Sequence, residues 1–214
     1  MKKTLKITLF LAGWMVIATM CSFPWTKKVD PANENTWTWN AEFNDKIAAE
    51  YKEIGRTVLK TSFLTLTGEV TKAMKEGGVP HAVSYCNLKA YPLVDSLSEH
   101  FNVSIKRVAE KYRNPNNAMR LFEQELFQAY NTKNENKESI MDQVVLSSDN
   151  YLEYYAPIIL TQPCLACHGN IGTDIREEDY QLIKSLYPED LATGFTPGDL
   201  RGMWRIRFMP KEPQ

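Results

Sequence analysis

The chain has 214 residues, of which 43% are hydrophobic and 24% are charged, and its formal net charge is −1. These values are typical of a globular domain of ordinary composition. Because no stripe of Lys and Arg runs through the sequence, a nucleic-acid partner is not expected. Beyond the N-terminal segment, no apolar run predicts a membrane span.

The N-terminal segment, residues 1–25, is typical of an export signal. Lys2, Lys3 and Lys6 precede an apolar run of about 18 residues. Three interpretations are open: an uncleaved membrane anchor, a cleaved signal peptide, or a lipoprotein signal in which Cys21 is lipidated. Each places the rest of the chain outside the cytoplasmic membrane. We therefore expect a periplasmic protein, anchored to the inner membrane if the segment is retained.

Helices are predicted for the first half of the exported part. Residues 26–40 are polar and predict a tether. From residue 41 to residue 76, apolar residues recur at helical spacing and predict one long helix that ends at Gly77-Gly78. A second helix is expected from Pro80, and Pro92 is expected to interrupt it.

The pattern then becomes mixed. Phe101, Val103 and Ile105 alternate with polar residues, which predicts a half-buried strand reaching about Ala109. One α+β domain over residues 41–210 is the simplest interpretation. Its further expected elements are a turn at 113–117, a helix at 118–130, a polar loop at 131–139, a hairpin of strands 143–146 and 151–159 turning around 148–150, a helix at 177–186 and a strand at 202–208.

The run Cys164-Leu165-Ala166-Cys167-His168 carries the strongest chemical signal. Two thiols on one helical turn can both reach the vinyl groups of one porphyrin, and the histidine that follows can bind the iron. The pattern therefore predicts covalent attachment of one haem c. A redox dithiol and a zinc site are the alternatives, but no βαβ pattern surrounds the motif and no second ligand pair has zinc-finger spacing.

The sequence motif does not identify the second axial ligand of the haem iron. Methionines and the histidines His81 and His100 are candidates by type. Cys86 is the only cysteine of the exported domain outside the attachment motif. On residue type alone it is either a ligand or a small buried core residue.

Several segments together resemble a family of exported c-type haem domains that was long a domain of unknown function. The family is typified by a small cyanobacterial haem protein found with photosystem II, and similar domains occur as sensor modules of membrane signalling proteins. The resemblance extends in the same order over nearly the whole domain. The segments that carry it are Ala82–Cys86, Arg113–Asn117, Cys164–Gly169, Tyr187–Phe195 and Gly198–Gly202.

The resemblance implies a PAS-like antiparallel sheet flanked by helices, with a long N-terminal helix. It also implies that His168 is the proximal ligand and Cys86 the distal ligand of the iron. Met119 stands where the family pattern has a second proline, and Trp204 replaces a smaller residue. Arg113 and Arg201 are candidate partners of the haem propionates, since a guanidinium binds a carboxylate through two parallel hydrogen bonds; the alternative is that both are surface residues.

A His/Cys-ligated haem would have a low reduction potential, because the anionic thiolate stabilises ferric iron. We therefore expect a one-electron carrier with a redox partner protein and a membrane contact only through the N-terminal segment. The alternative is a redox or gas sensor that binds a small diatomic ligand and signals to a separate partner. A peroxidase-type enzyme is the third reading, and no catalytic residue is assigned.

Overall fold

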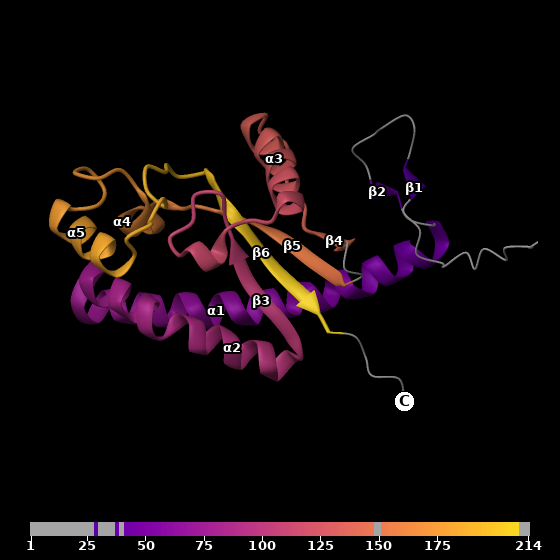
Figure 1. Ribbon diagram of the computed structural model, residues 1–214, viewed down its shortest axis with the longest axis horizontal. Coiled ribbons are helices and arrows are strands. Elements are labelled where there is room, and N and C mark those ends of the chain that lie inside the picture. The colour runs from indigo at the N-terminus through magenta and orange to yellow at the C-terminus, as the bar shows by residue number, and fades with distance from the viewer. Residues whose placement is uncertain (1–27, 30–36, 39–40, 148–150, 210–214) are drawn as a thin grey trace, which may run out of the picture. The chain divides into compact units, whose positions relative to one another are not determined.

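The structure is a computed structural model that describes residues 28–29, 37–38, 41–147 and 151–209 (Figure 1). The chain divides into two compact units, residues 1–44 and 45–214. In the first unit, strands β1 (Lys28–Val29) and β2 (Trp37–Thr38) pair antiparallel within the stretch predicted as a tether. The segment predicted as a leader lies outside the described residues.

The second unit is built on a four-stranded antiparallel sheet with the strand order β3-β6-β5-β4. The strands are β3 (Val103–Val108), β4 (Gln143–Leu146), β5 (Leu152–Ile159) and β6 (Leu200–Phe208). The last strand of the chain thus lies inside the sheet, between β3 and β5. With helices flanking this sheet, the predicted α+β, PAS-like class is confirmed.

Two helices cover one face of the sheet: α1 (Ala41–Leu88) and α2 (Ala90–Phe101) (Figure 1). Gly55 allows α1 to approach closely, since a Cβ at this position would lie 2.4 Å from Cγ of Tyr154. The buried core between these layers is formed by Val58, Leu66, Ala90, Val94, Val103, Ile105, Tyr154, Ala156, Trp204, Ile206 and Phe208.

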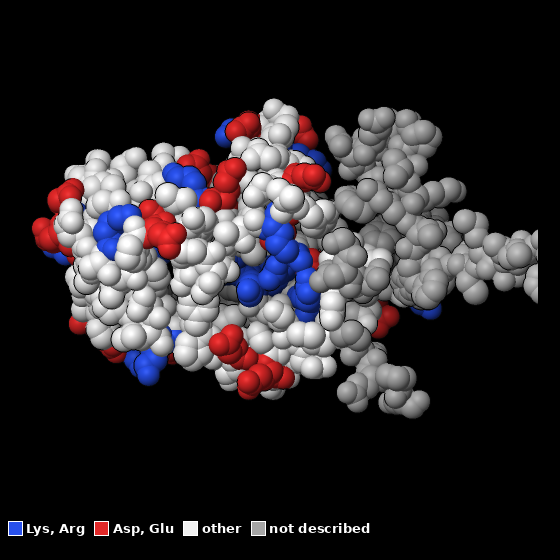
Figure 2. Space-filling model, in the orientation of Figure 1, with Lys and Arg blue, Asp and Glu red and all other residues white. Residues whose placement is uncertain are grey.

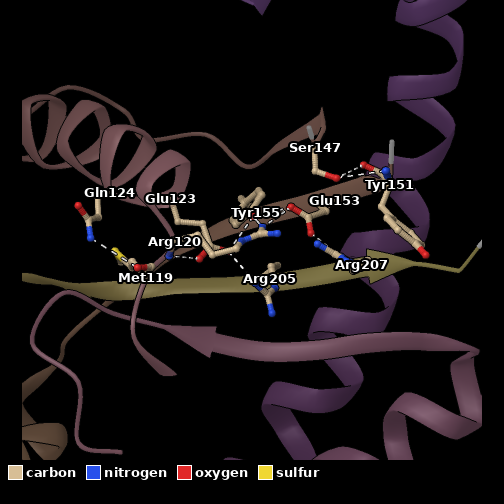
Figure 3. Close-up of polar contacts among 10 residues, drawn as sticks. All are labelled: Met119, Arg120, Glu123, Gln124, Ser147, Tyr151, Glu153, Tyr155, Arg205 and Arg207. Atoms are coloured by element: carbon tan, nitrogen blue, oxygen red, sulfur yellow. Dashed lines mark hydrogen bonds and ion pairs between the residues drawn. The ribbon is translucent and has the colours of Figure 1, made fainter. Parts of the chain in front are cut away.

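The opposite face is covered by α3 (Leu121–Glu135), which follows a short 3₁₀ helix, η1 (Pro115–Asn117). Beside its apolar core lies a set of charged and phenolic side chains that we call the α3 network (Figure 3). Basic side chains gather on the surface over β3 and β6 next to α3 (Figure 2), whereas both carboxylates of the network are fully buried. The network consists of Arg120, Glu123, Glu153, Tyr155, Arg205 and Arg207.

The remaining helices lie near the C-terminal end of α1 (Figure 1). They are η2 (Gln162–Cys164), α4 (Leu165–His168) and α5 (Glu177–Leu186). A third apolar cluster joins them to α1, with Val83 buried against Ile183 and Tyr187 and with Cys167 packed at its edge. This cluster brings Cys86, three residues after Val83, toward the attachment motif.

Three details differ from the sequence-based expectations. The predicted interruption around Pro92 falls at Lys89, between α1 and α2, because a proline has no N–H to bond the carbonyl of Leu88, four residues before it. Pro92 itself lies in the first turn of α2. Helix α3 continues to Glu135, into the segment expected to be a loop. Phe101 is the last residue of α2 rather than the first of β3. The predicted break at Gly77-Gly78 is confirmed, because both residues leave the helical conformation and Gly78 has a φ of 66°.

Among the residues that the structure describes, no helix is both long and apolar enough to cross a membrane.

Candidate functional site

The attachment motif forms a single helical turn that cannot be stable by itself, since a four-residue helix does not repay its nucleation. The loop before β6 holds it. Phe195 N–H donates to the carbonyl of His168 (3.1 Å), and Gly194 N–H donates to the carbonyl of Gly169 (2.8 Å). Gly169 has room for no side chain, because a Cβ there would lie 2.5 Å from Asp174. The motif is thereby held at its C-terminal end.

His168 is half-buried, and its ring lies 2.8 Å, Nδ1 to oxygen, from the carbonyl of Ala192. A carbonyl only accepts, so Nδ1 carries the hydrogen and the lone pair of Nε2 is left for another partner. Burial lowers the pKa of His168 well below its ordinary value, and the charges of Arg113 and Arg201 lower it further. The imidazole is therefore neutral at pH 7, which is the form that binds metals.

The three cysteines of the described residues are half-buried and free. Burial raises the pKa of Cys167 to about 11, and the charges of Cys86 and Cys164 add to this rise, so all three thiols are electrostatic neighbours. Burial also raises the pKa of Cys86, whereas Arg107 and Arg113 lower it. The structure thus brings Cys86 to the motif, although the two are far apart in the sequence.

Arg113 is engaged by the protein itself. Its Nε donates to Asp190 (3.0 Å) and its Nη2 donates to the carbonyl of Cys167 (2.6 Å). The Asp190 side chain is fully buried and also accepts from the N–H of Ala192 (3.0 Å). The guanidinium therefore links the motif to the loop that holds His168.

Arg201 lies at the start of β6, with its guanidinium 5.4 Å from the ring centroid of Phe195. Its buried Nε has no hydrogen-bond partner. Burial, together with the charges of Arg113 and Arg107, lowers the pKa of Arg201 to about 9. Leaving a buried donor unpaired destabilises a protein by about 1–3 kcal/mol. Nε of Arg201 is therefore available to an acceptor from outside the chain.

The other candidates from the sequence lie elsewhere. His81 and His100 are exposed, and Met119 and Met203 belong to the core beneath α3. Trp204 packs in the core on the α1 side of the sheet. Sequence reasoning missed Arg107 and Tyr91. Arg107 could have been noticed, because it continues the apolar series of Val103 and Ile105 in β3.

The residues at this site fit the predicted haem. They offer paired thiols on one turn, a neutral imidazole with one committed nitrogen, a third thiol nearby and a buried cation without a partner. Among the residues that the structure describes, no group of three or more His, Cys, Asp or Glu side chains is arranged to hold a single metal ion.

Comparison with known proteins gives two matches. A family model described as Tll0287-like matches residues 32–209. The solved structure titled "Crystal structure of the cyanobacterial heme-protein Tll0287" is 26% identical, with a TM-score of 0.53, and the match covers 76% of this chain and 98% of that one. Among curated proteins no match was found. Since the family model spans most of the sequence, this chain belongs to the Tll0287-like family.

Proposed function

We propose that this chain is a haem-binding domain that carries one haem c on Cys164 and Cys167, with His168 and Cys86 as axial ligands, and that it transfers single electrons in the periplasm. Membership of the family and the likeness to a cyanobacterial heme-protein support the haem cofactor. Covalent attachment, the ligands and the electron-transfer role are our own inferences from the residues and their surroundings.

The observation that carries the proposal is the state of His168. Its Nδ1–H is bound to Ala192 and its ring is neutral, so Nε2 is an available donor. A hydrogen bond from the second ring nitrogen orients a metal-bound imidazole and makes it more basic. The backbone bonds from Gly194 and Phe195 hold the main chain at His168 and Gly169.

Cys86 supports a redox role. Haem supplies reversible one-electron chemistry at its iron. Burial raises the pKa of Cys86, the charges of Arg107 and Arg113 offset part of this rise, and a bound metal ion would deprotonate the thiol. A thiolate ligand favours the oxidised state, so we expect a low reduction potential. The partner of this reaction would be a second redox protein, and residues 1–25 would be the signal peptide or inner-membrane anchor.

A sensor is the second candidate, and the position of Cys86 favours it. Cys86 lies near the end of α1, shortly after the kink at Gly77-Gly78. If reduction or a diatomic ligand displaced the thiolate, the last turns of α1 would lose one of their attachments. Two non-helical residues within a long helix are a place where its direction can change.

The test is the Cys86→Ala variant of the full chain, expressed together with a c-haem maturation system. We expect low-spin spectra of a thiolate ligand, optical and by electron spin resonance, in the wild type and their loss in the variant. Ser84→Ala is the matched control, since the hydroxyl of this half-buried neighbour donates to the carbonyl of Pro80 within α1. Binding of carbon monoxide by reduced wild-type protein would favour the sensor over the carrier. Colourless protein would refute haem binding, and pigment released by acidified acetone would refute covalent attachment.

A further inference from the structure

Two buried hydrogen-bond donors near the proposed haem site have no acceptor in the protein: the hydroxyl of Tyr91 on α2 and Nε of Arg201 on β6. The side chain of Asn117 lowers the pKa of Tyr91 as a donor to its oxygen, so it offers no acceptor for the hydroxyl hydrogen. Buried donors in native proteins nearly always have a partner, so orphans of this kind indicate an acceptor from outside the chain. The other orphan donors of the described residues, on Arg120 and Arg205, belong to guanidinium groups already bound to Glu123 in the α3 network.

The charges around the site are also unbalanced. Three guanidinium groups act on His168, those of Arg107, Arg113 and Arg201. The buried carboxylate of Asp190 forms its ion pair with Arg113. Within the described residues no carboxylate forms an ion pair with Arg107 or Arg201, and each of these lies over an aromatic ring instead. Two guanidinium groups are therefore left without an ion-pair partner, and the carboxylate of Asp190 acts on Arg201 only from a distance.

The unpaired groups share one neighbourhood. Arg107 acts electrostatically on both Tyr91 and Cys86, and Arg201 is affected by the charge of Arg107. They thus lie around the same two ligand candidates, Cys86 and His168. A ligand that satisfies all of them must carry two negative charges and at least two acceptor groups.

We infer that Arg107 and Arg201 each bind one of the two carboxylates of the porphyrin, and that the hydroxyl of Tyr91 donates to the carboxylate held by Arg107. This assignment rests on the proposed function. The two uncompensated guanidinium groups equal the carboxylates in number, and a guanidinium matches a carboxylate in shape. Arg113, by contrast, is a positioning residue: it holds the Cys167 carbonyl through a side chain committed to Asp190.

The test measures the midpoint potential of the haem-loaded full-length protein as a function of pH. The potential changes slope at the pKa of a carboxylate that titrates close to the iron. Because a neighbouring guanidinium lowers a carboxylate's pKa by about 1–3 pH units, Arg107→Gln and Arg201→Gln should each move that inflection upward by this amount. Tyr91→Phe should move it in the same direction by less. Arg56→Gln, an equal charge change at an exposed ion pair of α1, should leave it unmoved.

Double variants test which groups share a carboxylate. The shifts of Arg107→Gln and Tyr91→Phe should not add, because both groups bind one carboxylate, whereas those of Arg107→Gln and Arg201→Gln should add. Arg107→Lys and Arg201→Lys keep the positive charge, so they should shift the inflection less than the Gln variants do. They serve as the test if the Gln variants do not accumulate as folded protein. Variants with normal ligand spectra and an unmoved inflection would overturn this assignment alone, whereas a wild-type protein without haem would refute the proposed function itself.

Discussion

Replacing Glu123 by Gln should destabilise the protein strongly. Its carboxylate is fully buried and accepts from Arg205 Nη1 (2.8 Å), Tyr155 OH (2.9 Å) and Arg120, through both Nη2 (2.9 Å) and the backbone N–H (2.8 Å). Gln keeps the shape but removes the charge, and its NH₂ group would face one of these donors. Breaking a buried ion pair from one side costs about 3–5 kcal/mol. Since the Arg120 side chain is 38% exposed, we expect about 3 kcal/mol.

The measurement is urea denaturation of the haem-loaded protein at pH 7, followed by circular dichroism. In a thermal melt of the same protein, a loss of about 3 kcal/mol in the free energy of unfolding corresponds to a fall in Tm of about 6–12 °C for a chain of this size. Glu125→Gln, an exposed neighbour on α3, should stay within about 0.5 kcal/mol of the wild type. Replacing both Glu123 and Arg205 by Leu should cost less than Glu123→Gln alone, because no charge is left unpaired. A loss below about 1 kcal/mol for Glu123→Gln would refute this reasoning.

The Glu123 carboxylate should also make the stability of the protein depend on pH. Burial opposes its ionisation, but the N–H of Arg120 and the charges of Arg205 and Arg120 outweigh burial, so the pKa of Glu123 is lowered from 4.5. A lowered folded-state pKa adds stability above the ordinary pKa, and this stability is lost as the pH falls through the folded-state value. The stability gap between wild type and Glu123→Gln should therefore narrow below pH 4.5.

Two further predictions concern α1. Asp142 is half-buried, and this burial opposes its ionisation, yet hydrogen bonds from Arg56 and Tyr154 and the charge of Lys52 lower its pKa from 3.8 to about 2. Asp142→Asn should therefore cost about 1–2 kcal/mol at pH 7. The difference in stability should vanish between pH 4 and pH 2, as urea denaturation at several pH values would show. Gly55→Ala should lower Tm because its Cβ would overlap a tyrosine ring, whereas Gly68→Ala, with nothing within 4 Å, should stabilise by about 0.5–1 kcal/mol. Equal shifts in Tm for the two glycine variants would contradict the packing argument.

The parts of the fold that could be predicted are those encoded by neighbouring residues. Val103 and Ile105 reveal β3 by alternation, and the paired glycines reveal the kink of α1. The interruption was expected at Pro92 but lies at Lys89, because a proline is compatible with the first turn of the helix that follows the break. The end of α3 was missed because polar residues such as Glu135 also occupy exposed helical positions.

The α3 network and the environment of Arg201 could not be read from the sequence. Glu123 and Arg205 are 82 positions apart, and only the packing of α3 against β6 brings them together. The attachment motif was visible because its chemistry is local. Arg113 was recognised as part of the site, but its commitment to Asp190 depends on the folding of a distant loop. Ionic partners far apart in sequence leave no periodic signal.

The loop between α5 and β6 belongs to the site as much as the motif does. The motif offers only one helical turn, so the ring of His168 is as well positioned as the loop that binds it. That loop accepts the ring's N–H at Ala192 and donates to the motif's carbonyls through Gly194 and Phe195. Gly194 has a φ of 76°, a conformation that other residues adopt only with strain. The segment Tyr187–Phe195, which contains no metal-binding motif, therefore determines whether the imidazole of His168 is positioned to bind a metal.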